Sequence, residues 1–205
     1  TNPTTSGTGR NRSQLATANR LLDAAGYEMG ADGIRTHMET GVRLEFEIID
    51  NQAAFERWVL PMIRNLERVG IKATFRVLDD SQLVNRLRSF DYDMTIHSFG
   101  QSNSPGNEQR EFWGSAKADM DGSRNIIGIK DPVVDALIER VITAEDREAL
   151  ITATRALDRV LLHGYYVIPQ WHLNTWRVAY WDRFEKPENP SRKTLNALTT
   201  WWAKP

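Results

Sequence analysis

The chain has 205 residues, with 26 Lys or Arg against 27 Asp or Glu and no cysteine. Charges so evenly balanced and so scattered do not build the basic surface that grips a phosphate backbone, so we expect no nucleic-acid partner. The missing cysteine excludes disulfides, thiolate metal sites and cysteine nucleophiles. The length fits one domain or slightly more.

Helix and strand patterns alternate along the first half of the chain. Residues 1–12 are too polar to pack, so we interpret them as a linker or a cut end. Apolar residues at helical spacing then predict a helix over 13–25, and a Gly-containing loop is expected over 28–41. Apolar and polar residues alternate, as in half-buried strands, over three stretches: 42–48, 71–77 and 92–99.

Helical patterns separate these predicted strands. One helix covers residues 55–70 and contains Pro61, which should bend it; a shorter one follows a cap at Asp79 or Asp80. The resulting order β-α-β-α-β is typical of an α/β lobe, in which helices cover a sheet with parallel strands.

A polar segment over residues 98–125 follows the third predicted strand. Its Gly, Ser, Asn and Pro content predicts a long loop, and loops beyond the carboxyl end of a strand are where open α/β sheets bind ligands. Side-chain amides and hydroxyls can form hydrogen bonds with a peptide bond or a sugar hydroxyl, and a few charged side chains can fix the orientation of a ligand. The segment offers Gln101, Ser102, Asn103, Ser104, Asn107, Gln109, Ser115 and Asn125, the charged Glu108, Arg110, Glu111 and Arg124, and the aromatic Trp113.

The last part of the chain combines two helices with an aromatic tail. Asp131 is expected to cap a helix that begins at Pro132, and a second helix is expected over 145–163. The remainder predicts two short strands and an extended end. Because each Trp can bury about 150–250 Å², short strands cannot cover this cluster without a neighbour. Five of the seven tryptophans lie here: Trp171, Trp176, Trp181, Trp201 and Trp202.

The sequence offers no convincing catalytic or metal-binding pattern. The four histidines match no ligand spacing, and the calcium-like run from Asp119 to Gly122 lacks the closing Glu. We therefore predict no cofactor, no metal and no enzymatic activity. A hydrolase that uses Asp91, Asp93 or Glu108 is the alternative from another class of protein. A self-contained interaction module that docks through its tryptophans is a third.

Four runs along the chain carry a recognisable pattern: LLDAAGY, ERWVLPMIRNLERVGIKATFRVLDDSQLVNRLRSFDYDMTIHSFG, SPGNEQREFWGSAKADMDGSRNIIGIKDPVVDALI and IPQWHLNTWRVAYWDRF. Together they resemble the carboxyl-terminal part of the extracellular solute-binding proteins of family 5, the oligopeptide and dipeptide receptors of ABC importers. The run SPGNEQREFW followed by GSRNIIGIKDPVVD is most similar to the Yej-type peptide-binding branch. The resemblance spans about residues 13–202.

This resemblance implies a periplasmic binding protein-like fold and a periplasmic location. Residues 13–166 would form the carboxyl-side α/β ligand-binding lobe. Residues 167–205 would cross the hinge and add strands to an amino-terminal lobe that this chain does not contain, so that Thr1 would be an internal residue of a longer exported protein. The implied partners are a short peptide ligand, the amino-terminal portion of the same protein and ABC permease subunits in the inner membrane.

The resemblance also implies a binding mode. In the family, the stretch matching residues 98–103 runs beside an extended ligand and pairs with its backbone. The candidate ligand-binding residues are therefore Phe99, Gly100, Gln101, Ser102, Asn103, Ser104, Asn107, Glu108, Trp113, Arg124 and Asn125.

One position departs from the family pattern. Many relatives carry an aspartate just after this stretch that pairs with the ligand's α-amino group, whereas this chain has Ser102 and no acid before Glu108. Either Glu108 supplies the charge or the ligand is not a peptide with a free amino group. An oligosaccharide or an opine-like ligand is the alternative, and stacking of a sugar ring on Trp113 would favour it.

Overall fold

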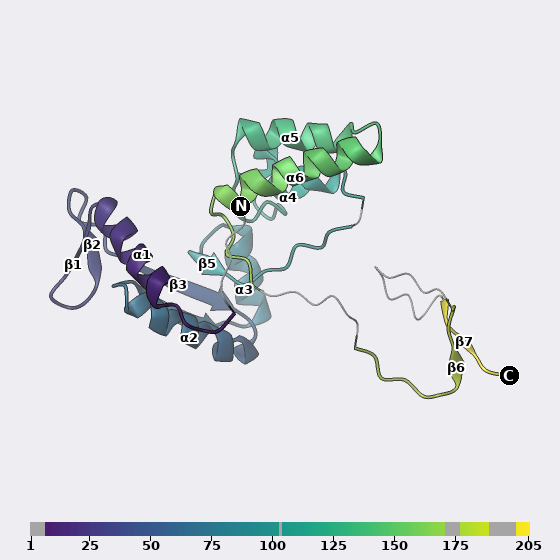
Figure 1. The fold of residues 1–205 in the computed structure, drawn as a ribbon, viewed down its shortest axis with the longest axis horizontal. Coiled ribbons are helices and arrows are strands. Elements are labelled where there is room, and N and C mark those ends of the chain that lie inside the picture. Colours follow the sequence, from purple (N-terminus) through teal and green to yellow (C-terminus); the bar gives the residue numbers. More distant parts are fainter. Residues whose placement is uncertain (1–6, 103, 171–176, 189–199) are drawn as a thin grey trace.

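The computed structural model describes residues 7–102, 104–170, 177–188 and 200–205. Within these ranges, no helix has the length and apolar character needed to span a bilayer. Figure 1 shows the elements, which in chain order are α1 (Arg12–Ala24), β1 (Tyr27–Met29), β2 (Arg35–His37), β3 (Glu45–Asp50), η1 (Ala53–Phe55), α2 (Glu56–Glu67), β4 (Lys72–Val77), α3 (Asp80–Arg88), β5 (Met94–Thr95), α4 (Glu108–Trp113), η2 (Ser115–Lys117), α5 (Pro132–Ile142), α6 (Arg147–His163), β6 (Phe184–Glu185) and β7 (Trp202–Ala203).

A parallel sheet in the order β4-β3-β5 forms the centre of the first half of the chain. On one face, Ile48 packs with Ala73 against α2. On the other, Ile49 packs with Leu78 and with Leu83 of α3. Helices therefore cover both faces, and the predicted β-α-β-α-β order is confirmed over β3 to β5.

Two predictions about this half were inaccurate. Residues 28–41, expected to be a loop, contain most of a small hairpin in which β1 pairs antiparallel with β2. The third strand was expected over residues 92–99. Only Met94 and Thr95 pair with β3, beside Ile48 and Ile49. Its alternating pattern extends past the end of the neighbouring strand, so residues 97–102 continue without a strand beside them.

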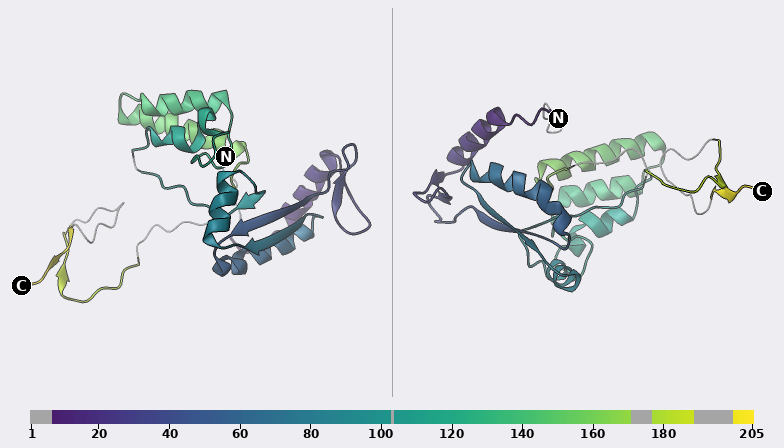
Figure 2. Two further views of the ribbon diagram at one scale, coloured as in Figure 1. Left: turned by 180° about the vertical axis from the view of Figure 1, so that it is seen from behind. Right: turned by 90° about the horizontal axis from the view of Figure 1, so that it is seen from below.

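We predicted one long loop over residues 98–125. This prediction was wrong, because α4 and η2 lie within the segment. Phe112 and Trp113 explain the difference: both are buried, and they pack with α5 and α6 residues such as Val134, Ile138 and Leu157. Figures 1 and 2 show α5 and α6 side by side with α4 against them. This apolar cluster is a second core, separate from the one beneath the sheet.

The tail contains the two short strands β6 and β7, which pair antiparallel with each other. Figures 1 and 2 show this ribbon apart from the sheet and from α5 and α6. Its aromatic side chains are poorly covered: Trp181 is 76% exposed and Trp202 49%. Trp171 and Trp176 lie outside the described residues.

Candidate functional site

The segment that leaves β5 presents backbone groups without partners. Among the described residues, the N–H and C=O groups of residues 98–101 make no hydrogen bond. Buried backbone groups are nearly always paired, so an unpaired run of them requires contact with water or with another chain. This segment is an open strand edge at the carboxyl end of the parallel sheet.

Phe99 fixes the segment to the helical half of the lobe. Its ring centroid lies 4.5 Å from that of Trp113, 5.7 Å from that of Phe112 and 4.7 Å from that of His97. The side chain of Phe99 thus holds the segment in place, while its backbone groups stay available.

Gln109, a residue of α4, holds the next part of the segment. Its Nε2 donates to Gln101 Oε1 at 2.7 Å, and its Oε1 accepts from Trp113 Nε1 at 3.0 Å. The Gln109 side chain is buried although Gln101 is exposed. From the sequence we named Gln109 among the polar residues of the segment but not among the candidate ligand-binding residues; its four-residue spacing from Trp113 on a helix would have indicated the pair.

Glu108 and Asn107 have partners within the lobe. Glu108 accepts a hydrogen bond from the Gly106 N–H at 3.0 Å. Partial burial acts to raise the pKa of Glu108, but the backbone N–H groups of Glu108 itself and of Gly106 keep it below the usual value, so the carboxylate is ionised. Asn107 accepts from Arg110, which also forms a two-pronged ion pair with Glu139 at 2.7 and 2.6 Å.

Asn125 and Arg124 both have contacts within the lobe. Asn125 has no exposed surface; it donates to the Gly114 and Ile129 carbonyls and accepts from the Ile129 N–H. These hydrogen bonds hold the Asn125 side chain within the lobe, and its contact with a ligand stays a prediction. Arg124 lies over the Phe112 ring at 4.3 Å.

Most of the remaining candidates lie on the open edge or directly behind it. The structure brings Phe99, Gly100, Gln101 and Ser102 together on the open edge, and the Ser102 hydroxyl accepts from the Ser104 N–H at 3.1 Å. Trp113 lies directly behind this edge and is buried. Asn103 lies outside the described residues.

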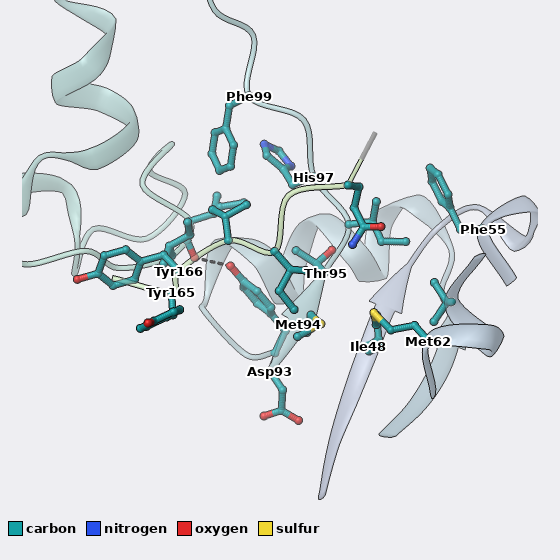
Figure 3. Close-up of a pocket in the computed structure, with 18 of the residues that line it drawn as sticks. Ile48, Phe55, Met62, Asp93, Met94, Thr95, His97, Phe99, Tyr165 and Tyr166 are labelled. Carbon is teal, nitrogen blue, oxygen red and sulfur yellow. Dashed lines mark hydrogen bonds between the residues drawn. The ribbon is translucent and has the colours of Figure 1, made fainter. Parts of the chain in front are cut away.

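An apolar cavity of about 420 Å³ opens on one side of the segment. Figure 3 shows His97 and Phe99 on one wall, Phe55 and Met62 on another, and Tyr165 and Tyr166 on a third. Desolvation, together with the nearby charge of Arg124, lowers the pKa of His97. The neutral ring therefore persists to lower pH than is usual, which suits an apolar wall.

A second hollow of about 420 Å³ lies farther along the segment. Gln101, Ser102 and Pro105 line one wall, and residues of α6 line the opposite wall. Consecutive parts of the segment thus line different cavities: His97 and Phe99 line the first, and Gln101 and Ser102 the second.

The carboxylates considered for a hydrolase have structural partners. Asp91 pairs with Arg86 at 3.3 Å, and Asp93 accepts from the backbone N–H of Glu47 at 2.9 Å. In the part of the chain that the structure describes, no three His, Asp or Glu side chains gather in a way that could hold a metal ion.

A family model described as bacterial extracellular solute-binding proteins, family 5 Middle, matches residues 2–121. The chain belongs to this family. The fold seen here, a parallel sheet with helices on both faces, is that of periplasmic binding protein-like family 5 proteins.

Individual relatives match nearly the whole chain. A probable peptide-binding protein YejA of Agrobacterium fabrum is 43% identical over 98% of this chain and 33% of its own length. A peptidoglycan-binding protein YepA of the same species is 38% identical over 98% of this chain and 32% of its own length. The chain therefore spans about a third of the length of these relatives. The oligopeptide-binding protein AppA of Bacillus subtilis, solved with a nonapeptide, superposes with a TM-score of 0.69 over 93% of this chain and 37% of its own, at 17% identity.

Proposed function

We propose that this chain forms the carboxyl-side part of the substrate-binding component of an ABC transporter. In this proposal the whole protein captures short peptides in a cleft between two lobes and delivers them to a membrane permease, without catalysis. The observation that carries it is the unpaired backbone of residues 98–101. An extended peptide can add to such an edge as a strand, so that main-chain hydrogen bonds give affinity and adjacent pockets select side chains.

The two cavities support a peptide over other ligands. Side chains of an extended peptide that pairs with this edge need room beside it, and two cavities are lined by residues of this segment. Stacking of a sugar ring on Trp113, the contact that would favour an oligosaccharide, is disfavoured because Trp113 is buried against Phe99 and Phe112. The YejA relative, named as a probable peptide-binding protein, supports the same choice.

The tail completes the proposal. Residues 13–166 form the ligand-binding lobe, and residues 167–205 cross the hinge and add strands to the amino-terminal portion of the same protein. Exposed apolar side chains support this role for the tail: Val167, Ile168, Val178, Tyr180, Trp181 and Trp202. A two-stranded ribbon is barely stable in water by itself, so β6 and β7 need a larger sheet to join. Export to the periplasm and docking on permease subunits in the inner membrane belong to the same proposal.

A peptidoglycan fragment is the second candidate ligand. The YepA relative, named as peptidoglycan-binding, supports it, and such fragments carry short peptides that could pair with the same edge. The two candidates differ in whether the attached sugar adds affinity.

Isothermal titration of the full-length protein tests the function. We expect heat on adding mixed di- to hexapeptides, and no increase in affinity when the peptide carries an amino sugar. A gain of more than tenfold from the sugar would favour the second candidate. The absence of heat with every peptide, with or without the sugar, would contradict both candidates.

A further inference from the structure

Two aromatic residues have a left-handed backbone. Phe90 has a φ of 56° and Tyr165 a φ of 55°, and within the described ranges no other residue except glycine has a positive φ. Each lies two residues beyond the last residue of a helix, α3 for Phe90 and α6 for Tyr165, and both line the apolar cavity beside the open edge. Left-handed torsions are unfavourable for side chains with a Cβ, so they persist only where the surroundings hold them.

The neighbours of Phe90 hold it firmly. The Asp91 N–H donates to the Arg86 carbonyl at 2.9 Å, and the Tyr92 hydroxyl donates to the Ile126 carbonyl. The chain then enters β5, which pairs with β3. The backbone after Phe90 is therefore fixed by hydrogen bonds on consecutive residues.

Tyr165 lacks such support. Its side chain is 85% exposed, and its N–H makes one long hydrogen bond, to the Leu162 carbonyl at 3.4 Å. Residues 166–170, which we call the exit segment, follow it. Among the described residues, backbone groups of the exit segment make no hydrogen bond, and its Val167 and Ile168 side chains are exposed. The position of the exit segment therefore depends mainly on the backbone torsions of Tyr165.

The left-handed torsions place the exit segment over the apolar cavity. Figure 3 shows Tyr165 and Tyr166 on one wall of this cavity, with His97 and Phe99 on another. The Tyr166 ring lies so close to Gly164 that a Cβ there would be 2.2 Å from the ring. Right-handed or extended torsions at Tyr165 would direct the exit segment elsewhere, because a change at one residue reorients the chain that follows.

Peptide binding favours the position seen here. A peptide that pairs with the open edge and places a side chain in the cavity contacts both walls, the one beside Phe99 and the one formed by the exit segment. A ligand shifts an equilibrium toward the state with which it makes more contacts. The unfavourable backbone of Tyr165 opposes that shift.

From these observations, and resting on the proposed function, we infer that Tyr165 is a conformational switch. Its left-handed state places the exit segment over the cavity and binds peptide. Its right-handed or extended state, which has lower torsional energy, moves the segment away and favours release. The strain thus lowers the affinity for peptide, as a receptor that must hand on its ligand requires.

Three substitutions in the full-length protein test the switch: Tyr165→Gly, Tyr165→Asn and Tyr165→Val. All remove the ring and differ in how readily they become left-handed, since Gly does so freely, Asn tolerates it and β-branched Val resists it. The probe is the peptide that the wild type retains best from a mixture of tri- to hexapeptides, titrated by calorimetry. The torsional cost corresponds to about five- to thirtyfold in an equilibrium constant, so the Gly variant should bind at least about fivefold tighter than the Val variant. The Asn variant should lie between them.

Phe90→Gly and Phe90→Val are the matched controls. They change the same torsional preference at a residue whose following chain is fixed, so their urea unfolding should differ, whereas their peptide affinities should agree within about twofold. Thermal unfolding checks that every variant folds. Tyr165→Ala replaces the Val variant if the latter does not fold, with the same expected sign.

The results separate the switch from the proposed function. If the wild type retains no peptide, the peptide-binding function fails and the switch fails with it. If the wild type binds peptide but the Gly and Val variants at Tyr165 have equal affinity, or Val binds tighter, the function stands and the switch is overturned. Equal differences at Phe90 and Tyr165 would assign the effect to strain anywhere in the lobe and would also overturn it.

Discussion

Replacing Gln109 with Leu tests how the open edge is held. Leu has nearly the size of Gln but removes the acceptor for Trp113 Nε1 at 3.0 Å and the donor to Gln101 Oε1 at 2.7 Å. Because Gln109 and Trp113 are buried, the indole N–H is left unpaired in the core, at a cost of about 1–3 kcal/mol. The exposed Gln101 can turn to water, so its loss adds about 1 kcal/mol or less. We expect about 1–4 kcal/mol in total.

Urea denaturation of the full-length protein, followed by tryptophan fluorescence, measures this change. Gln82→Leu is the control, because Gln82 is an exposed helical glutamine on α3 and should change stability by less than about 0.5 kcal/mol. Peptide affinity should also fall in the Gln109 variant, because residues 97–102 are then held mainly by Phe99. If the Gln109 variant unfolds at the same urea concentration as wild type, with the same slope, the buried pair does not have the role assigned here.

Three further substitutions probe the framework of the lobe. Arg35→Met removes the donors to the Val69 carbonyl at 2.9 Å and to Asp23 at 2.6 Å. It should lower the free energy of unfolding by about 3 kcal/mol in urea denaturation. A loss below about 1 kcal/mol would show that Arg35 does not stabilise the lobe. Tyr92→Phe leaves the Ile126 carbonyl without its hydroxyl donor and should cost about 1 kcal/mol by the same assay; no loss would contradict it. Burial raises the pKa of Asp50, so its ionised form is disfavoured in the folded state. Asp50→Asn should therefore raise the melting temperature relative to wild type at pH 7.

The sign of the Asp50 prediction follows from linkage. At a pH well below the ordinary Asp pKa, the carboxyl is protonated in both folded and unfolded protein, so the Asn variant gains nothing from the missing charge. As the pH rises above that value, the unfolded chain ionises more readily than the folded one, and the wild type loses stability relative to the variant. The gain should thus be larger at pH 7 than at pH 4. An equal gain at both values would show that the charge is not the cause.

The sequence predicted those parts of the fold that depend on neighbouring residues. Helix caps are of this kind: the Asp79 and Asp131 side chains accept from the N–H groups of Gln82 and Val133, as their positions before helical patterns indicated. The strands of the parallel sheet were likewise visible from their alternation. The polar composition of residues 98–125 was misleading, because only the placement of Phe112 and Trp113 against α5 and α6 makes α4 a helix.

The candidate site was predicted only in part, for the same reason. The open edge containing Phe99 and Gln101 follows from the strand pattern and the family resemblance. Which side chains lie behind that edge depends on contacts between distant elements, such as those that bury Asn125 and place Gln109 beneath Gln101. The α6 residues that line the second hollow are more than 40 residues away from that edge in sequence, and no local pattern connects the two.

Hydrogen exchange of the full-length protein tests the central claim most directly. Backbone amides of residues 98–101 have no partner among the described residues, so we predict fast exchange without ligand. Adding a retained peptide should slow exchange at some of these amides by at least tenfold, while amides in α5 stay unchanged. Slow exchange in the ligand-free protein, or no change on peptide binding, would contradict pairing of the peptide with this edge.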